Sequence, residues 1–359
     1  MNCEEINQVD YLKLAHLVIE KVTDEPFERA KAFISPLSTN YYSFVFFIEL
    51  SNKNSTQKVF VKIPKEDLRK KDKLILPISK GDRDLAEAEV KSLKVLSEQW
   101  DSDDIKVSWV KIRAEIPEYN AIITDAAEGN ELLNVFRNWD TGGRFSFGTK
   151  KHRLISVMSR IGEALARFHQ QNYSTVKLDS NQIRSKIEFY CRELQHKVAS
   201  SDLFEKLEKG CQILKDEEES VYMVPTLKGI DIRNILIDQD DKVSILDPGR
   251  LKLASREADL SRFIMTYRIL YWGSRLFLFI YPDKDAEKAF LKAYYDNSFP
   301  ASGNVLHFYL IKEQLKHWYT AHESLEMHSY PTIVKRLLVG VYVNPYYIFQ
   351  LTTELGKIN

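Results

Sequence analysis

Short apolar runs separated by polar turns dominate the first part of the chain. The run 33–50 predicts two strands joined by a small polar turn, and 57–64 predicts a third strand with an alternating pattern. A mostly apolar run at 121–124 predicts one more strand. The pattern therefore predicts a mainly β region that ends near Asp125.

Helical spacing of apolar residues appears in two longer stretches. In 83–98 the apolar residues recur at helical spacing, and 154–169 is strongly amphipathic. Each stretch predicts a helix with one face turned to a core.

A hairpin is predicted late in the chain. The runs 235–237 and 243–246 are apolar and flank the acidic turn 238–241. Pairing of these runs would bring Asn234 and Asp247 to the same end of the sheet. A carboxylate beside an amide oxygen is suitable ligation for the Mg²⁺ that nucleotide phosphates carry.

This segment resembles the catalytic and metal loops of the aminoglycoside-phosphotransferase and choline-kinase branch of the protein-kinase superfamily. The family pattern is His-Gly-Asp, four residues, Asn-Ile-Leu, a turn, then Ile-Asp-x-Gly. Asn234, Asp247 and Gly249 match it. The resemblance implies that Asn234 and Asp247 bind Mg²⁺.

The chain departs from the family where the general base is expected. Leu227 stands at the His position, Lys228 at the Gly position and Gly229 at the position of the catalytic Asp. Asp231 is the next carboxylate, two residues later, and is the candidate base.

Two further residues fit the resemblance. Lys62 lies inside the strand 57–64, as does the family lysine that pairs with the α- and β-phosphates, and Glu89 lies on the following helix. Taken singly, Lys62 is also consistent with an edge-strand charge and Glu89 with a solvated helix face.

Nucleotide contacts are assigned by position. The polar turn in 33–50 contains Ser38 and Asn40, which would cover the phosphates, although an ordinary hairpin turn explains the turn equally well. The connector from Asp125 to Ala127 would present backbone groups to adenine, which leaves no side-chain signature.

Three short matches follow in family order. His169 ends the helix 154–169, and the segments 257–263 and 289–294 resemble Asp-Leu-Ala-Arg-Leu and Phe-Leu-x-x-Tyr. Ordinary helix patterning, or in the case of His169 a favourable helix-end charge, could supply each of them.

Composition narrows the class of protein. The 359 residues are 44% hydrophobic with a formal charge of zero, so the chain can bury a large core and has no basic field to recruit nucleic acid. Three widely spaced cysteines suggest reduced thiols in the cytoplasm, and the acidic N-terminus is no signal peptide. Charges or proline interrupt the apolar segments 263–281 and 333–351, so neither is a clean membrane span.

The resemblance implies a bilobal α+β kinase-like fold, with a small β-rich nucleotide-binding lobe at 1–125 and a larger helical catalytic lobe at 126–359. It implies an ATP- and Mg²⁺-dependent phosphotransferase that acts on a hydroxyl of a small molecule or glycan. Because Gly229 replaces the usual base, a catalytically inactive nucleotide-binding or scaffold protein is the alternative, and transfer of another part of the nucleotide is a third possibility. The acceptor and the oligomeric state have no sequence signature.

Overall fold

The structure is a computed structural model. It describes residues 3–23, 31–40, 42–51, 56–66, 74–100, 103–132, 147–198, 200–216, 220–275, 284–296, 299–327 and 329–358. The chain divides into two compact units. Unit 1 comprises Met1–Val135, Leu227–Gly229 and Asn234–Leu251, and unit 2 comprises Phe136–Thr226, Ile230–Arg233 and Lys252–Asn359.

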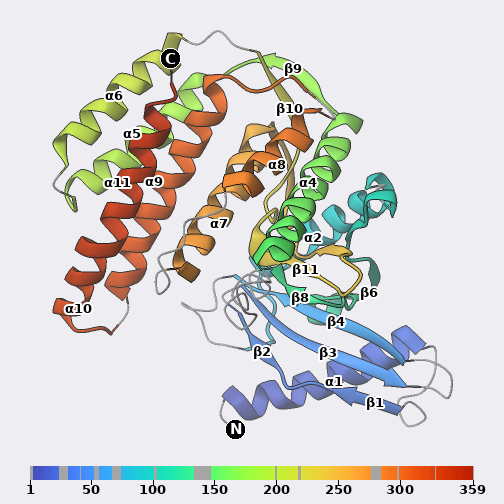
Figure 1. Cartoon of the computed structure of the whole chain (residues 1–359). Helices are drawn as coiled ribbons and strands as arrows, with labels where there is room; N and C mark the ends of the chain where they lie inside the picture. Colours follow the sequence, from blue (N-terminus) through green and yellow to red (C-terminus); the bar gives the residue numbers. More distant parts are fainter. Residues whose placement is uncertain are drawn as a thin grey trace. The chain divides into compact units, whose positions relative to one another are not determined.

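Unit 1 is built on an antiparallel sheet whose strands follow the order β1-β3-β4-β7-β6, with β2 paired to β3. The strands and the helices of this unit are β1 (Lys31–Ile34), β2 (Ser38–Thr39), β3 (Ser43–Ser51), β4 (Thr56–Pro64), β6 (Ile112–Ile116), β7 (Ala121–Asp125), α1 (Cys3–Thr23) and α2 (Lys80–Gln99). In Figure 1, α1 runs alongside β3 and β1. The mainly β region predicted from the sequence is confirmed, with α1 added to it.

The alternation in β4 decides which side chains reach which face of the sheet. Val59, Val61 and Ile63 are fully buried in the core that α1 covers. Lys62 points the other way, because successive side chains in a strand alternate between faces. Its cross-strand partner Ile122 packs with α2 residues. Lys62 is therefore on the face of the sheet that α2 covers.

The predicted hairpin is confirmed and forms part of a second sheet in unit 1. Strands β11 (Ile235–Ile237) and β12 (Val243–Ile245) pair antiparallel, and the sheet order is β5-β12-β11-β8. The outer strands are β5 (Val107–Trp109) and β8 (Asn130–Glu131). Short turns of 3₁₀ helix are η2 (Asp103–Ile105), η3 (Pro117–Tyr119) and η6 (Ile232–Asn234).

Unit 2 is mainly helical and also contains the sheet β13-β10-β9. Its elements are α4 (Phe147–Gln171), β9 (Ser174–Lys177), α5 (Ser180–Gln195), α6 (Ser201–Asp216), β10 (Ser220–Leu227), β13 (Leu251–Ser255), α7 (Glu257–Arg275), α8 (Lys284–Asp296), α9 (Asn304–Met327), α10 (Thr332–Leu337), the π-helix η7 (Leu338–Val343) and α11 (Asn344–Leu355). Together the two units form a mixed α+β chain, as predicted.

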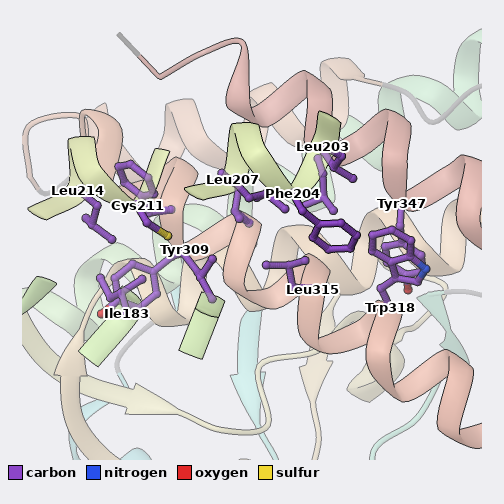
Figure 2. Packing of buried hydrophobic residues seen from close by; sticks show 14 of the residues in the cluster. Ile183, Leu203, Phe204, Leu207, Cys211, Leu214, Tyr309, Leu315, Trp318 and Tyr347 are labelled. Carbon is purple, nitrogen blue, oxygen red and sulfur yellow. The ribbon is translucent and has the colours of Figure 1, made fainter. Parts of the chain in front are cut away.

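The core of unit 2 lies among α5, α6, α9 and α11 (Figure 2). Trp318 of α9 stacks on Phe204 and on Tyr347, with ring centroids 6.5 and 5.8 Å apart. Trp318, Phe204 and Tyr347 thus serve packing, which is the ordinary role of aromatic residues in a core.

One buried hydrogen-bond network joins three of the short sequence matches. His169 at the end of α4 is fully buried, and its Nδ1 lies 2.8 Å from the Tyr294 hydroxyl of α8. Its Nε2 lies 3.3 Å from Asp259 Oδ2 of α7. His169, Asp259 and Tyr294 therefore tie three helices together, and burial raises the pKa of Tyr294 well above its usual value.

The structure bears on the expected absence of a membrane span. No described helix combines the length and apolar character that a membrane span needs, and residues 276–281 of the apolar segment 263–281 lie outside the described part of the chain.

The division of the chain differs from the expected one. The sequence placed all of 126–359 in one lobe, whereas the structure assigns Leu227–Gly229 and Asn234–Leu251 to unit 1. The hairpin thus packs with the unit that contains Lys62.

Candidate active site

Lys62 is the centre of a three-residue charged cluster in unit 1. Its Nζ lies 2.9 Å from the carboxylate of Glu89 and 2.8 Å from Asp247 Oδ1. The three residues come from β4, α2 and the end of the β11–β12 hairpin. A partly buried lysine that bridges two carboxylates is held in one orientation.

Helix α2 fixes Glu89 beneath the sheet. Ala86, Val90 and Leu93 form its buried face against Ile122, and Glu89 lies on this same side. Burial of a glutamate on the core side of a helix is costly unless it is paired. Its partner is Lys62, so the interpretation of Glu89 as a solvated charge is wrong.

The start of α2 is anchored to the end of β4. Ser79 caps the helix and forms a capping box with Asp82. The Asp82 carboxylate also accepts from Lys65 Nζ at 3.1 Å. Burial would raise the pKa of Asp82, but hydrogen bonds from the backbone of Glu66 and Ser79 and the ammonium of Lys65 lower it. These contacts tie α2 to the strand that carries Lys62.

The hairpin brings Asn234 and Asp247 to the same end, as the sequence predicted. Leu246 donates its backbone N–H to Asn234 O at 2.7 Å, which places Asp247 directly after this pair. Asp247 has a φ of 48°, in the left-handed region. The side-chain Nδ2 of Asn234 donates to Gly229 O at 3.0 Å, so the amide oxygen is directed away from this bond.

Asn234 and Asp247 carry oxygen atoms of the type that Mg²⁺ prefers. The Asp247 side chain is 48% exposed, and both residues offer hard oxygen atoms of the kind Mg²⁺ prefers. Within the described residues, no group of three or more His, Cys, Asp and Glu side chains is placed to hold a metal ion. Asn234 and Asp247 would hold Mg²⁺ together with phosphate oxygens, since Mg²⁺ commonly takes one or two protein carboxylates plus substrate phosphates.

The cluster favours a charged lysine. Burial alone would lower the pKa of Lys62, but the charges and hydrogen bonds of Glu89 and Asp247 outweigh it and raise the pKa. Burial raises the pKa of Glu89 and the charge of Asp247 adds to this, although Lys62 opposes both. Two carboxylates around one ammonium leave an excess negative charge that a bound cation would relieve.

Gly229 occupies a position that admits no side chain. A Cβ built on it would overlap the carbonyl oxygen of Asp247 and lie 2.8 Å from the carbonyl carbons of Asp247 and Pro248. The Gly229 N–H donates to Pro248 O at 2.9 Å, which holds the two segments together. An aspartate at this position is therefore incompatible with this backbone, and Leu227, at the family's His position, is fully buried.

Asp231, the candidate base, is in unit 2 and pairs with Arg233. Its carboxylate accepts from the backbone N–H of Arg233 at 3.0 Å and from Nε at 2.8 Å, and also from the second guanidinium nitrogen. The hydrogen bonds to Asp231 raise the pKa of Arg233. The structure thus places Asp231 in a bidentate ion pair, in which each charged hydrogen bond is about twice as strong as a neutral one.

His317 of α9 lies in the electrostatic surroundings of this ion pair. Its pKa is lowered from 6.5 to about 4, chiefly by burial and also by the charges of Lys316 and Arg233, while Glu313 and Asp231 oppose the change. His317 is therefore neutral at ordinary pH.

The remaining predicted residues lie at the sheet edge and in the connector. Ser38 pairs with Val45, which pairs in turn with Lys62, so Ser38 and Lys62 are on the same face with one strand between them. Asn40 is exposed and donates its backbone N–H to Ser43 O at 2.8 Å.

Asp125 ends β7 and pairs with Arg113, and the N–H of Ala126 donates to Lys58 O at 3.1 Å. Ala127 follows and is partly buried. The nucleotide roles of these connector residues and of Ser38 and Asn40 stay predictions.

Sequence reasoning missed two pairings. The direct contact of Lys62 with Asp247 joins residues far apart in the chain, and nothing in the sequence signals it. The pairing of Asp231 with Arg233 is local, and the two-residue spacing of opposite charges around Ile232 was the signal that could have found it.

Solved structures of kinases and phosphotransferases are similar to this chain in fold. A choline kinase from Cryptosporidium parvum Iowa II superimposes with a TM-score of 0.53 at 12% identity, over 96% of this chain and 95% of that one. Choline kinase LicA from Streptococcus pneumoniae gives 0.48 at 12% identity, over 96% and 99%. A macrolide 2'-phosphotransferase type I gives 0.48 at 11%, over 95% and 96%.

These solved structures are small-molecule kinases and phosphotransferases by name. The chain thus has a kinase-like fold, similar to that of the choline kinase from Cryptosporidium parvum Iowa II. No protein-family model matches the chain, and no match is found among curated proteins.

Proposed function

We propose that this protein is an ATP- and Mg²⁺-dependent phosphotransferase that acts on a hydroxyl of a small molecule or glycan in the cytoplasm. The observation that carries the proposal is the cluster in which Lys62 Nζ lies within 2.9 Å of Glu89 and 2.8 Å of Asp247. A structural ion pair needs one carboxylate, whereas this lysine joins the helix glutamate to a proposed metal ligand. Kinases use this combination to position ATP phosphates.

Each residue of the proposed active site would have a separate role. Lys62 would bind phosphate oxygens, Glu89 would keep Lys62 oriented, and Asn234 and Asp247 would hold the metal. When bound, Mg²⁺ neutralises charge on the phosphate oxygens. Asp231 would accept the proton of the acceptor hydroxyl, which requires that Arg233 release part of its carboxylate.

Loss of the usual base is compatible with transfer. Phosphoryl transfer depends chiefly on positioning and on charge neutralisation. General-base catalysis adds about 10² to 10⁴-fold to the rate. A chain with Gly229 at the usual position can therefore be a slower kinase rather than an inert one.

A second candidate is a nucleotide-binding protein without transfer. Two observations favour it. A side chain at position 229 would overlap the Asp247 carbonyl, and the Asp231 carboxylate is already paired with Arg233. Both observations concern the base alone, and neither affects Lys62 or Asp247.

The two candidates separate in one assay. Transfer from γ-labelled ATP to amino-alcohol, sugar and glycan acceptors is measured for the wild type, for Asp231→Asn and for Arg233→Gln, with ATP affinity measured in parallel. The kinase proposal predicts that Asp231→Asn slows turnover about 10² to 10⁴-fold with unchanged ATP affinity, and that Arg233→Gln retains transfer. Mg²⁺-dependent ATP binding without transfer or hydrolysis in the wild type would favour the second candidate.

A further inference from the structure

The segment Thr332–Val343 in unit 2 exposes part of its apolar surface. It comprises α10 and η7, neither of which has a buried residue. Four of its apolar residues are exposed: Ile333 at 69%, Val334 at 37%, Leu337 at 58% and Val341 at 72%. In a helix that packs against a hydrophobic core, apolar residues with this spacing are buried.

The exposed apolar residues form one stripe. Positions i, i+1, i+4 and i+8 lie on one side of a helix, and these are the spacings of Ile333, Val334, Leu337 and Val341. Tyr330, which precedes the helix, is also half exposed. In Figure 1, α10 lies at the end of the α9 and α11 helices of this unit, at the lower left.

The charge of the segment has one sign. Lys335 and Arg336 lie within it, and no Asp or Glu occurs between Glu326 and Glu354. Lys335 Nζ donates to Glu326 O at 3.0 Å, which anchors the helix to the end of α9. Arg336 is exposed beside the stripe.

We propose that this segment is a docking surface for a membrane that carries anionic lipid headgroups. Exposed aliphatic side chains, a flanking tyrosine and cationic residues in the same segment are features of helices that lie in the bilayer interface. The helix lies on the membrane and does not cross it. The phosphotransferase proposal is not needed for this inference.

A second copy of the chain is a poorer occupant. A two-fold contact through this stripe would place both copies of Arg336 at one interface, with no acidic residue in the segment to balance them. An anionic surface satisfies the stripe and the cations at once.

Vesicle flotation of the full chain tests the proposal. Vesicles of phosphatidylcholine and phosphatidylglycerol in equal parts are compared with pure phosphatidylcholine, at low and high salt. The proposal predicts binding to the mixed vesicles that falls with salt, because screening weakens attraction to the headgroups. Binding to neither vesicle overturns it.

Variants separate the apolar and charged contributions. The triple change Ile333→Ser, Leu337→Ser and Val341→Ser removes only exposed side chains, so the fold is expected to persist. It is predicted to lower binding at least about tenfold. Arg336→Glu is predicted to abolish the preference for the anionic vesicles.

Leu253→Ser is the matched control, because Leu253 is 62% exposed and lies outside the segment. It is predicted to bind as the wild type does. Equal binding by the triple variant and the wild type would overturn the proposal. A wild-type dimer in solution that the triple variant does not form would also overturn the proposal, because the stripe would then be covered by a second copy.

Discussion

Gly229→Ala is expected to destabilise unit 1. The added Cβ would overlap the Asp247 carbonyl oxygen and lie 2.8 Å from two backbone carbons, and backbone atoms cannot rotate away as a flexible side chain can. Overpacking of a rigid site costs about 1–3 kcal/mol and occasionally more. We expect a loss near 3 kcal/mol, which lowers the thermal midpoint by roughly 6–10 °C.

The measurement is chemical and thermal unfolding, with Gly340→Ala as the matched control. A Cβ on Gly340 meets nothing within 4 Å. Alanine in this helical position is expected to stabilise by about 0.5–1 kcal/mol. Gly229→Ala with the stability of the wild type would refute the reasoning.

Gly229→Asp extends the prediction to function. It would restore the family's catalytic residue by sequence, yet the structure has no room for it. We therefore expect a protein less stable than Gly229→Ala and without a gain in transfer. A stable Gly229→Asp variant with faster turnover would contradict the account of this loop.

Three further predictions concern buried polar groups. Tyr294→Phe leaves His169 Nδ1 without its Tyr294 partner and should lower the free energy of unfolding by about 1–3 kcal/mol. A smaller loss would show that the network does not stabilise the fold. The depressed pKa of His317 contributes stability that is present above pH 6.5 and lost as pH falls toward 4. His317→Gln should therefore remove up to about 3 kcal/mol of the pH dependence in that window, and an unchanged pH profile of unfolding would exclude His317 as its source. Glu89→Gln should weaken ATP binding, measured by calorimetry, by about tenfold or more, because Lys62 loses a charged hydrogen bond. Unchanged affinity would show that Glu89 has no role in ATP binding.

Local pattern accounts for the parts of the fold that the sequence predicted. Alternation placed Lys62 on the face opposite Val59 and Val61, and two apolar runs around an acidic turn gave the hairpin that ends at Asp247. Both depend on side-chain periodicity within a few residues.

Long-range geometry accounts for what the sequence could not predict. The distance from Lys62 to Asp247 depends on how the hairpin packs in unit 1, and the clash at Gly229 depends on the path of the Asp247 backbone. The assignment of the hairpin to unit 1 also depends on long-range geometry, because contacts between residues far apart in the chain determine it, and amino-acid composition does not.

ATP binding by calorimetry, with and without Mg²⁺, tests the central claim most directly. It is made on the wild type, on Asp247→Asn and on Asp240→Asn, an exposed residue in the hairpin turn that serves as the control. The account predicts Mg²⁺-dependent binding by the wild type and by Asp240→Asn, and its loss in Asp247→Asn. Absence of binding in the wild type, or equal binding by Asp247→Asn, would contradict it.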